Sequence, residues 1–192
     1  MTYNDVFLRR NILLNIPLVF EGNKLPKSTA ASVMLLRVAY QNKVDEFIKF
    51  LEEAKKGFKK EGFDERAQAV SQMEDIDRRK KAADEWKEGD EGEKPTMPTA
   101  EELEKAEKTR GTLEEFNKEK KELEEQIQEA QNKKAVETVK MENGSLSKAE
   151  LADIYDMLGA DGDIDYSVPN QVEKVKVPKE WLLNMIATNL VG

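Results

Sequence analysis

A heptad repeat of mostly apolar residues constrains the fold more than any other feature of the sequence. Its members recur at alternating steps of three and four, which places them along one side of an α-helix. We therefore predict a helix between Lys27 and Lys60, about 50 Å long at about 1.5 Å per residue, with Pro26 before it and Ser28 as its cap. The repeat comprises Ala30, Val33, Arg37, Tyr40, Val44, Phe47, Leu51, Ala54 and Phe58.

The positions beside this repeat are apolar as well, at Met34, Leu36, Ile48 and Phe50. The resulting stripe is wider than a two-stranded coiled coil requires. It predicts that this helix contacts two or more partners.

Two further helices, both rich in charged residues, are predicted later in the chain. One runs from Asp64 to about Trp86 and is followed by an acidic linker or turn over residues 87–98, which holds two prolines. The other runs over 99–135 and begins with a capping box of Thr99 and Glu102. Its narrow heptad seam comprises Leu113, Phe116, Leu123, Ile127 and Ala130, with Lys120 and Lys134 in register.

Opposite net charges favour pairing of the predicted helix over 27–60 with the predicted helix over 99–135. Residues 27–60 hold eight basic and four acidic groups, whereas residues 101–129 hold six basic and eleven acidic groups. Individual exposed ion pairs are weak, but matched signs help to select which helix meets which. An antiparallel hairpin, a three-helix stalk and a homo-oligomeric coiled coil all fit this pattern.

The two ends of the chain are predicted to form a small base. In residues 1–26, Pro17 indicates an edge strand or an irregular extended segment, followed by a turn from Glu21. In residues 136–192 we expect a turn at Asn143-Gly144, a capped helix from Ser147, an acidic loop over 161–165, a strand over 172–177 and a helix after Pro178. The predicted fold is mainly α, with a long antiparallel helical hairpin or stalk on an α+β base. Its predicted segments are 1–26, 27–86, 87–98, 99–135 and 136–192.

The composition excludes most catalytic and metal chemistry. The chain has no His and no Cys, so disulfides, thiolate nucleophiles, Ser–His–Asp catalysis and zinc or iron–sulfur sites are impossible. No cleft for paired carboxylates is predicted either. We therefore expect no enzyme activity, no cofactor and no small-molecule substrate.

Calcium and nucleic acid were weighed as ligands. Residues 143–150 match only the second half of an EF-hand loop, and 161–172 only the first half, so capped turns are the better interpretation. The Arg78–Lys81 cluster is short, and the net charge of −8 disfavours nucleic acid. The apolar run from Ile12 to Phe20 is far shorter than the roughly 20 residues of a membrane span. We expect a soluble chain, made in the cytoplasm, that binds no membrane.

Three function classes fit these features. The first is a structural or assembly protein whose apolar base docks into a larger complex while its helical arm bridges neighbours. The second is a chaperone or scaffold that holds a client transiently, and the third is a regulatory coiled-coil adaptor. The wide apolar stripe favours the first, because permanent interfaces are larger and more apolar.

Three segments carry a resemblance to a family. Lys24-Leu25-Pro26 enters the heptad helix, residues 113–123 lie in a second charged helix, and residues 175–182 close the chain. Together they resemble small helical coiled-coil proteins encoded among the structural genes of tailed bacteriophages. The resemblance implies a virion or virion-assembly component, with other virion proteins as partners. Copies of the chain itself are a further partner if the heptad helices form a homo-oligomeric coiled coil.

The residues expected at such interfaces are apolar and large. Trp86, beside the acidic linker, is the strongest candidate for an exposed anchor. The full set is Ile16, Leu18, Phe20, Tyr40, Phe47, Leu51, Phe58, Trp86, Trp181 and Leu182.

Overall fold

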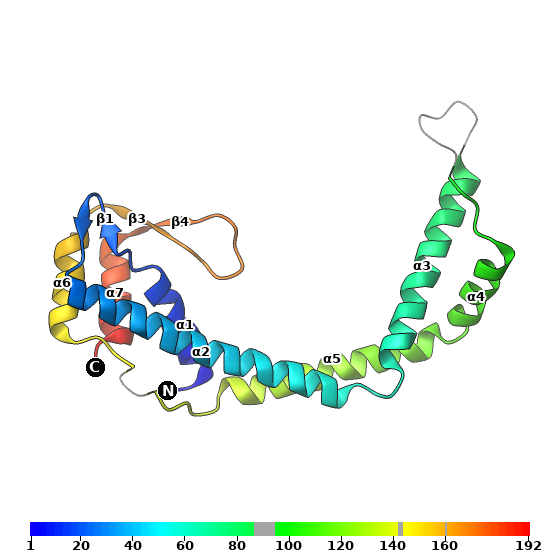
Figure 1. Ribbon diagram of the computed structural model, residues 1–192, viewed down its shortest axis with the longest axis horizontal. Helices are drawn as coiled ribbons and strands as arrows, with labels where there is room; N and C mark the ends of the chain where they lie inside the picture. The colour runs from blue at the N-terminus through cyan, green and yellow to red at the C-terminus, as the bar shows by residue number, and fades with distance from the viewer. Residues whose placement is uncertain (87–94, 142–143, 160) are drawn as a thin grey trace. The chain divides into compact units, whose positions relative to one another are not determined.

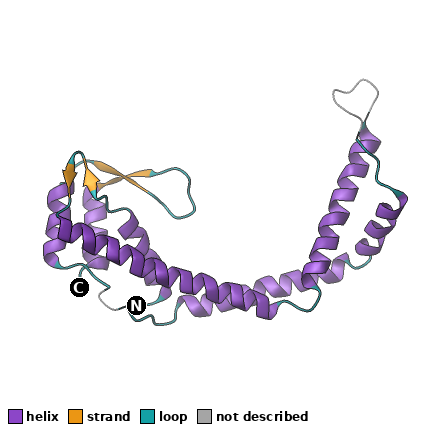
Figure 2. Ribbon diagram, viewed as in Figure 1, coloured by secondary structure: helices purple, strands orange, loops and turns teal. Residues whose placement is uncertain are grey.

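The protein is mainly helical in the computed structural model, which describes residues 1–86, 95–141, 144–159 and 161–192 (Figures 1 and 2). Residues 87–94 of the predicted linker, and Asn143 of the predicted turn, lie outside the described residues. The described chain divides into unit 1, residues 1–52 and 131–192, and unit 2, residues 53–130. Its helices are α1 (Tyr3–Leu14), α2 (Lys27–Phe58), α3 (Phe63–Glu85), α4 (Ala100–Arg110), α5 (Leu113–Ala135), α6 (Lys148–Leu158) and α7 (Lys179–Leu190). Its strands are β1 (Val19–Phe20), β2 (Asn23–Lys24), β3 (Asp163–Tyr166) and β4 (Val175–Pro178).

Both ends of the chain contribute to one core in unit 1. The backbone N–H of Leu146 donates to the carbonyl of Leu190 at 2.6 Å, and that of Val139 donates to Met1 at 2.8 Å. These bonds join the segment before α6 to the C-terminal and N-terminal ends. The fully buried apolar side chains are Val6, Ile12, Leu13, Ile16, Val33, Tyr40, Leu146, Ile154, Leu182, Ile186 and Leu190.

Residues 3–14 form a helix, so the prediction of an extended segment was wrong there, whereas after Pro17 it was right in part, because Val19–Phe20 form β1. Thr2 and Asp5 form a capping box that starts α1, because each satisfies a backbone N–H of the first turn. Pro17 lies beyond the end of the helix, where it interrupts nothing. The guanidinium of Arg37 donates to the carbonyl of Leu13, in the last turn of α1, and to that of Ile16 just beyond the helix.

Two short antiparallel hairpins complete unit 1 (Figure 2). The predicted turn after Phe20 joins β1 to β2, and both of its central residues, Glu21 and Gly22, have positive φ angles of 48° and 86°. Such angles match the right-handed twist of a hairpin. The predicted acidic loop was wrong in its second half, because residues 163–166 form β3. The alternating burial of β3 turns Ile164 and Tyr166 inward and its two aspartates outward.

Unit 2 is built on two small apolar clusters. Phe63 of α3 meets Phe116 and Leu123 of α5, and Met73 and Ile76 of α3 meet Ala106 of α4. Among the described elements, α3 and α4 make the most extensive helix–helix contact. The predicted coiled-coil hairpin of the first and third helices is therefore not confirmed.

The predicted helix over 99–135 is interrupted at Gly111 and Thr112. Its start is correct, since Thr99 and Glu102 form the expected capping box of α4. At the break, the hydroxyl of Thr112 donates to the carbonyl of Thr109 at 3.0 Å and satisfies one of the carbonyls that the helix end leaves open. Ser28, predicted as a cap, instead lies inside α2, which begins at Lys27.

Substitution of Phe47 tests how the core of unit 1 is packed. Its ring packs on Tyr3 and Phe7, with centroid separations of 5.2 and 5.0 Å. We expect Phe47→Ala to lower the free energy of unfolding by about 3–5 kcal/mol, because it removes buried surface and leaves a cavity. Exposed Ile48, the next residue of α2, provides the control. Equal losses in chemical denaturation of Phe47→Ala and Ile48→Ala would contradict this packing.

Candidate protein interface

The outward face of α2 carries an uninterrupted apolar ridge, which we define as Ala31, Met34, Leu35 and Val38. All four residues are exposed, with Met34 at 46%, Leu35 at 71% and Val38 at 56%. Their spacing of i, i+3, i+4 and i+7 puts them on one side of the helix. The ridge therefore forms a continuous apolar strip rather than scattered single residues.

Packing against the core of unit 1 does not explain why the ridge residues are apolar. The buried residues of the same stretch, Val33, Leu36, Tyr40 and Val44, follow the same helical spacing but lie about half a turn away at 3.6 residues per turn. A helix with one face on the core normally presents polar side chains on the other. The first half of α2 is apolar on both faces, which is typical of a helix covered on two sides.

Polar residues bound the ridge along the helix. Lys27 lies one turn before Ala31, and Asn42 and Asp45 follow Val38 at steps of four and three. All three are exposed and lie on the ridge side of α2. The ridge thus has a cation at one end and an anion at the other.

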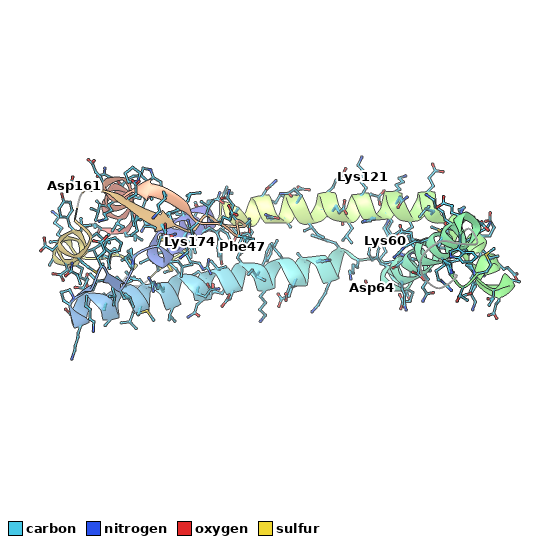
Figure 3. All side chains as sticks on the ribbon, turned by 90° about the horizontal axis from the view of Figure 1, so that it is seen from above. Phe47, Lys60, Asp64, Lys121, Asp161 and Lys174 are labelled. Atoms are coloured by element: carbon cyan, nitrogen blue, oxygen red, sulfur yellow. The ribbon has the colours of Figure 1, made fainter. Side chains whose placement is uncertain are left out.

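Unit 2 presents a different kind of surface, dominated by charged pairs between helices. Arg66 of α3 binds Glu119 of α5 through two guanidinium nitrogens, at 2.7 and 3.1 Å. Fork-to-fork pairs of this type fix geometry as well as charge. Lys121 of α5, which pairs with Glu125 of the same helix at 3.8 Å, extends outward (Figure 3).

Two further pairs join α3 to α4. Arg110 binds Asp77 at 2.7 Å, and Arg79 binds Glu102 at 2.6 Å. Beside them, a groove of about 630 Å³ runs between the helices, with apolar residues such as Ile76 and Ala106 in its lining and charged residues around them. Arg79 and Glu102, which both line this groove, neutralise each other.

Glu102 is the most strongly perturbed of these groups. The hydrogen bond from Arg79, followed by that from the Thr99 backbone, lowers the pKa of Glu102 from 4.5 to about 2. Both partners stabilise the ionised carboxylate. Its role is to cap α4 and to tie α4 to α3.

The structure divides the predicted interface residues by burial. Ile16, Tyr40, Phe47 and Leu182 are buried in unit 1, and Leu18, Phe20 and Leu51 pack partly buried around them. Side chains without exposed surface cannot meet a partner unless the fold opens. The exposed candidates are Phe58 and Trp181, and Trp86 is half-buried.

Sequence reasoning missed Leu35 and Val38, the two most exposed members of the ridge. The signal was present, because residues 30–36 contain only one polar side chain, that of Ser32. Spacing along a single helix cannot decide which of two apolar faces meets the core. The heptad was therefore predicted at the interface, although Val33, Tyr40, Val44 and Phe47 of this repeat line the interior.

The described part of the chain contains no cluster of three or more Asp and Glu residues placed to hold a metal ion. No helix there is long and apolar enough to span a bilayer. The chain matches no known family model, no curated protein and no solved structure.

The low pKa of Glu102 makes stability depend on pH. A carboxylate with a depressed pKa stabilises the fold fully above its ordinary pKa and loses this contribution as pH falls. We expect the melting-temperature difference between the wild type and Glu102→Gln to be a few degrees at most near pH 7, since the site is exposed. It should shrink between pH 4.5 and about 2.

Glu104→Gln, an exposed change on the same helix, is the matched control and should leave the melting temperature nearly unchanged throughout. A difference for Glu102→Gln that stays constant down to pH 2 would contradict the ion pair with Arg79.

Proposed function

We propose that the chain is a non-catalytic structural component of a bacteriophage virion, made in the host cytoplasm and located in the neck or tail or on the capsid. The apolar ridge of α2 is the observation that carries this proposal. Such a strip, rimmed by polar residues, is typical of a surface that binds protein. The resemblance of three segments to phage structural proteins supplies the particular setting.

The helices that bear the paired charges serve as an arm in this proposal. The Lys60–Glu122 pair, at 3.1 Å, and the packing of Phe63 on Phe116, with centroids 5.4 Å apart, support contact between the segment after α2 and α5. The opposite net charges of residues 27–60 and residues 101–129 favour pairing of these stretches in an antiparallel coiled-coil stalk. The arm would bridge neighbouring virion proteins, while unit 1 docks through its ridge.

An assembly chaperone or scaffold is the second candidate. The exposure of Leu35 and Val38 in the single chain supports it, because a protein that acts transiently must keep its binding surface accessible. The two candidates differ in whether the chain remains in the finished particle.

Particle composition tests both candidates. Finished particles and assembly intermediates would be purified by density gradient from cells that express the genome encoding this chain, and each would be quantified by mass spectrometry. A fixed copy number in finished particles is the expected result. Presence in intermediates alone would select the chaperone.

Deletion of the coding sequence provides the matching control. We expect incomplete particles and a loss of infectious yield, with restoration when the chain is supplied separately. Absence from all particles, together with a normal yield from the deletion, would contradict both candidates.

A further inference from the structure

The residues at the two ends of the ridge indicate what covers it. Over residues 24–43 the only charged side chains are basic: Lys24, Lys27, Arg37 and Lys43. The next two charged residues, Asp45 and Glu46, are acidic. Arg37 turns toward α1 and Lys43 binds Glu46, so on the ridge side Lys27 precedes the strip and Asp45 follows it.

We propose that the ridge binds the ridge of a second copy of this chain, with the two α2 helices antiparallel. A two-fold axis near residue 36 places Met34 of one copy against Val38 of the other, and Val38 against Met34. The same axis places Lys27 opposite Asp45 at both ends. This inference rests on the proposed function in one respect, namely that the ridge is a docking surface.

The parallel arrangement is disfavoured by the same charges. It would place Lys27 against Lys27 and Asp45 against Asp45, and like charges across a helix pair are repulsive. In an antiparallel two-fold contact, each end of the strip meets the opposite end of the other copy, so the two ends must be complementary. The sequence of cation, apolar strip and anion meets that condition in the antiparallel orientation alone.

The size of the strip sets the strength of the dimer. The face from Lys27 to Asp45 is about 27 Å long at about 1.5 Å per residue, and its apolar part consists of four side chains. It covers well under the roughly 800 Å² per partner of a standard-size interface. The dimer is therefore weak and dissociates on dilution.

Sedimentation velocity of the full chain over a wide concentration range tests the contact. We expect reversible dimerisation, and at least a tenfold higher dissociation constant for Leu35→Glu, because a charge would enter an apolar contact without a partner. Val136→Glu is the matched control, since Val136 is an apolar residue of unit 1 with 64% exposure that lies off the ridge. Circular dichroism would establish that both variants remain folded.

Charge exchange tests the orientation. Lys27→Glu or Asp45→Lys alone should weaken the dimer, whereas the double variant should recover most of the lost affinity. In the double variant, the carboxylate introduced at one end of the strip would face the ammonium group introduced in the other copy. A parallel pair would show no such recovery. Failure of the double variant to recover would overturn the antiparallel assignment.

Crosslinking gives an independent measurement, because the chain has no Cys of its own. Mixed Ala31→Cys and Asn42→Cys chains should form a disulfide between the two variants under mild oxidation. Ala31→Cys alone should crosslink poorly. The reverse result would indicate a parallel pair and would overturn the proposal.

These outcomes are separable from those of the proposed function. A chain that stays monomeric at millimolar concentration, or a dimer unaffected by Leu35→Glu, overturns the self-association of the ridge. Such a chain could still be found at fixed copy number in particles, which would assign the ridge to another virion protein. A dimer with the expected behaviour that is absent from particles would overturn the function instead.

Discussion

Burial of the inner face of α2 is the constraint on which unit 1 depends. Tyr40 lies at its centre, fully buried, and its hydroxyl donates to the carbonyl of Gly144 at 2.7 Å. This bond joins α2 to a segment more than a hundred residues later. The remaining inner-face residues are covered by helices from both ends of the chain, so unit 1 exists only when these ends come together.

The helices of unit 2 are held together by a different combination of interactions, namely small apolar clusters and ion pairs. Its apolar clusters consist of a few side chains each, and ion pairs such as Arg66–Glu119 and Arg79–Glu102 lie beside them. Ion pairs open to solvent contribute little stability individually, but these pairs, one of them with its Glu119 side chain only 12% exposed, specify which helices adjoin and in what register. The high charge of the chain is thus used for pairing within the unit as well as for solvation.

Local signals in the sequence predicted where helices begin and end better than they predicted which helices pack together. The heptad located α2 to within two residues of its observed C-terminal end, and the capping boxes at Thr99 and Ser147 located the starts of two more helices. The box at Thr2 escaped notice because the apolar run and Pro17 pointed to extended structure. The break at Gly111 was missed, and a single glycine, which costs only about 1 kcal/mol inside a helix, does not by itself predict one. The ridge could not be recognised, since deciding which apolar face is inward requires the tertiary fold.

The division of unit 1 into two segments has a consequence for how the chain folds during synthesis. Residues 53–130 emerge from the ribosome as one continuous stretch, so unit 2 can form while α7 is still untranslated. The first 52 residues must wait for residues 131–190, with both apolar faces of α2 open to water. The inner face is closed only after residues 131–190 have been made, and the nascent chain is most prone to aggregation before then.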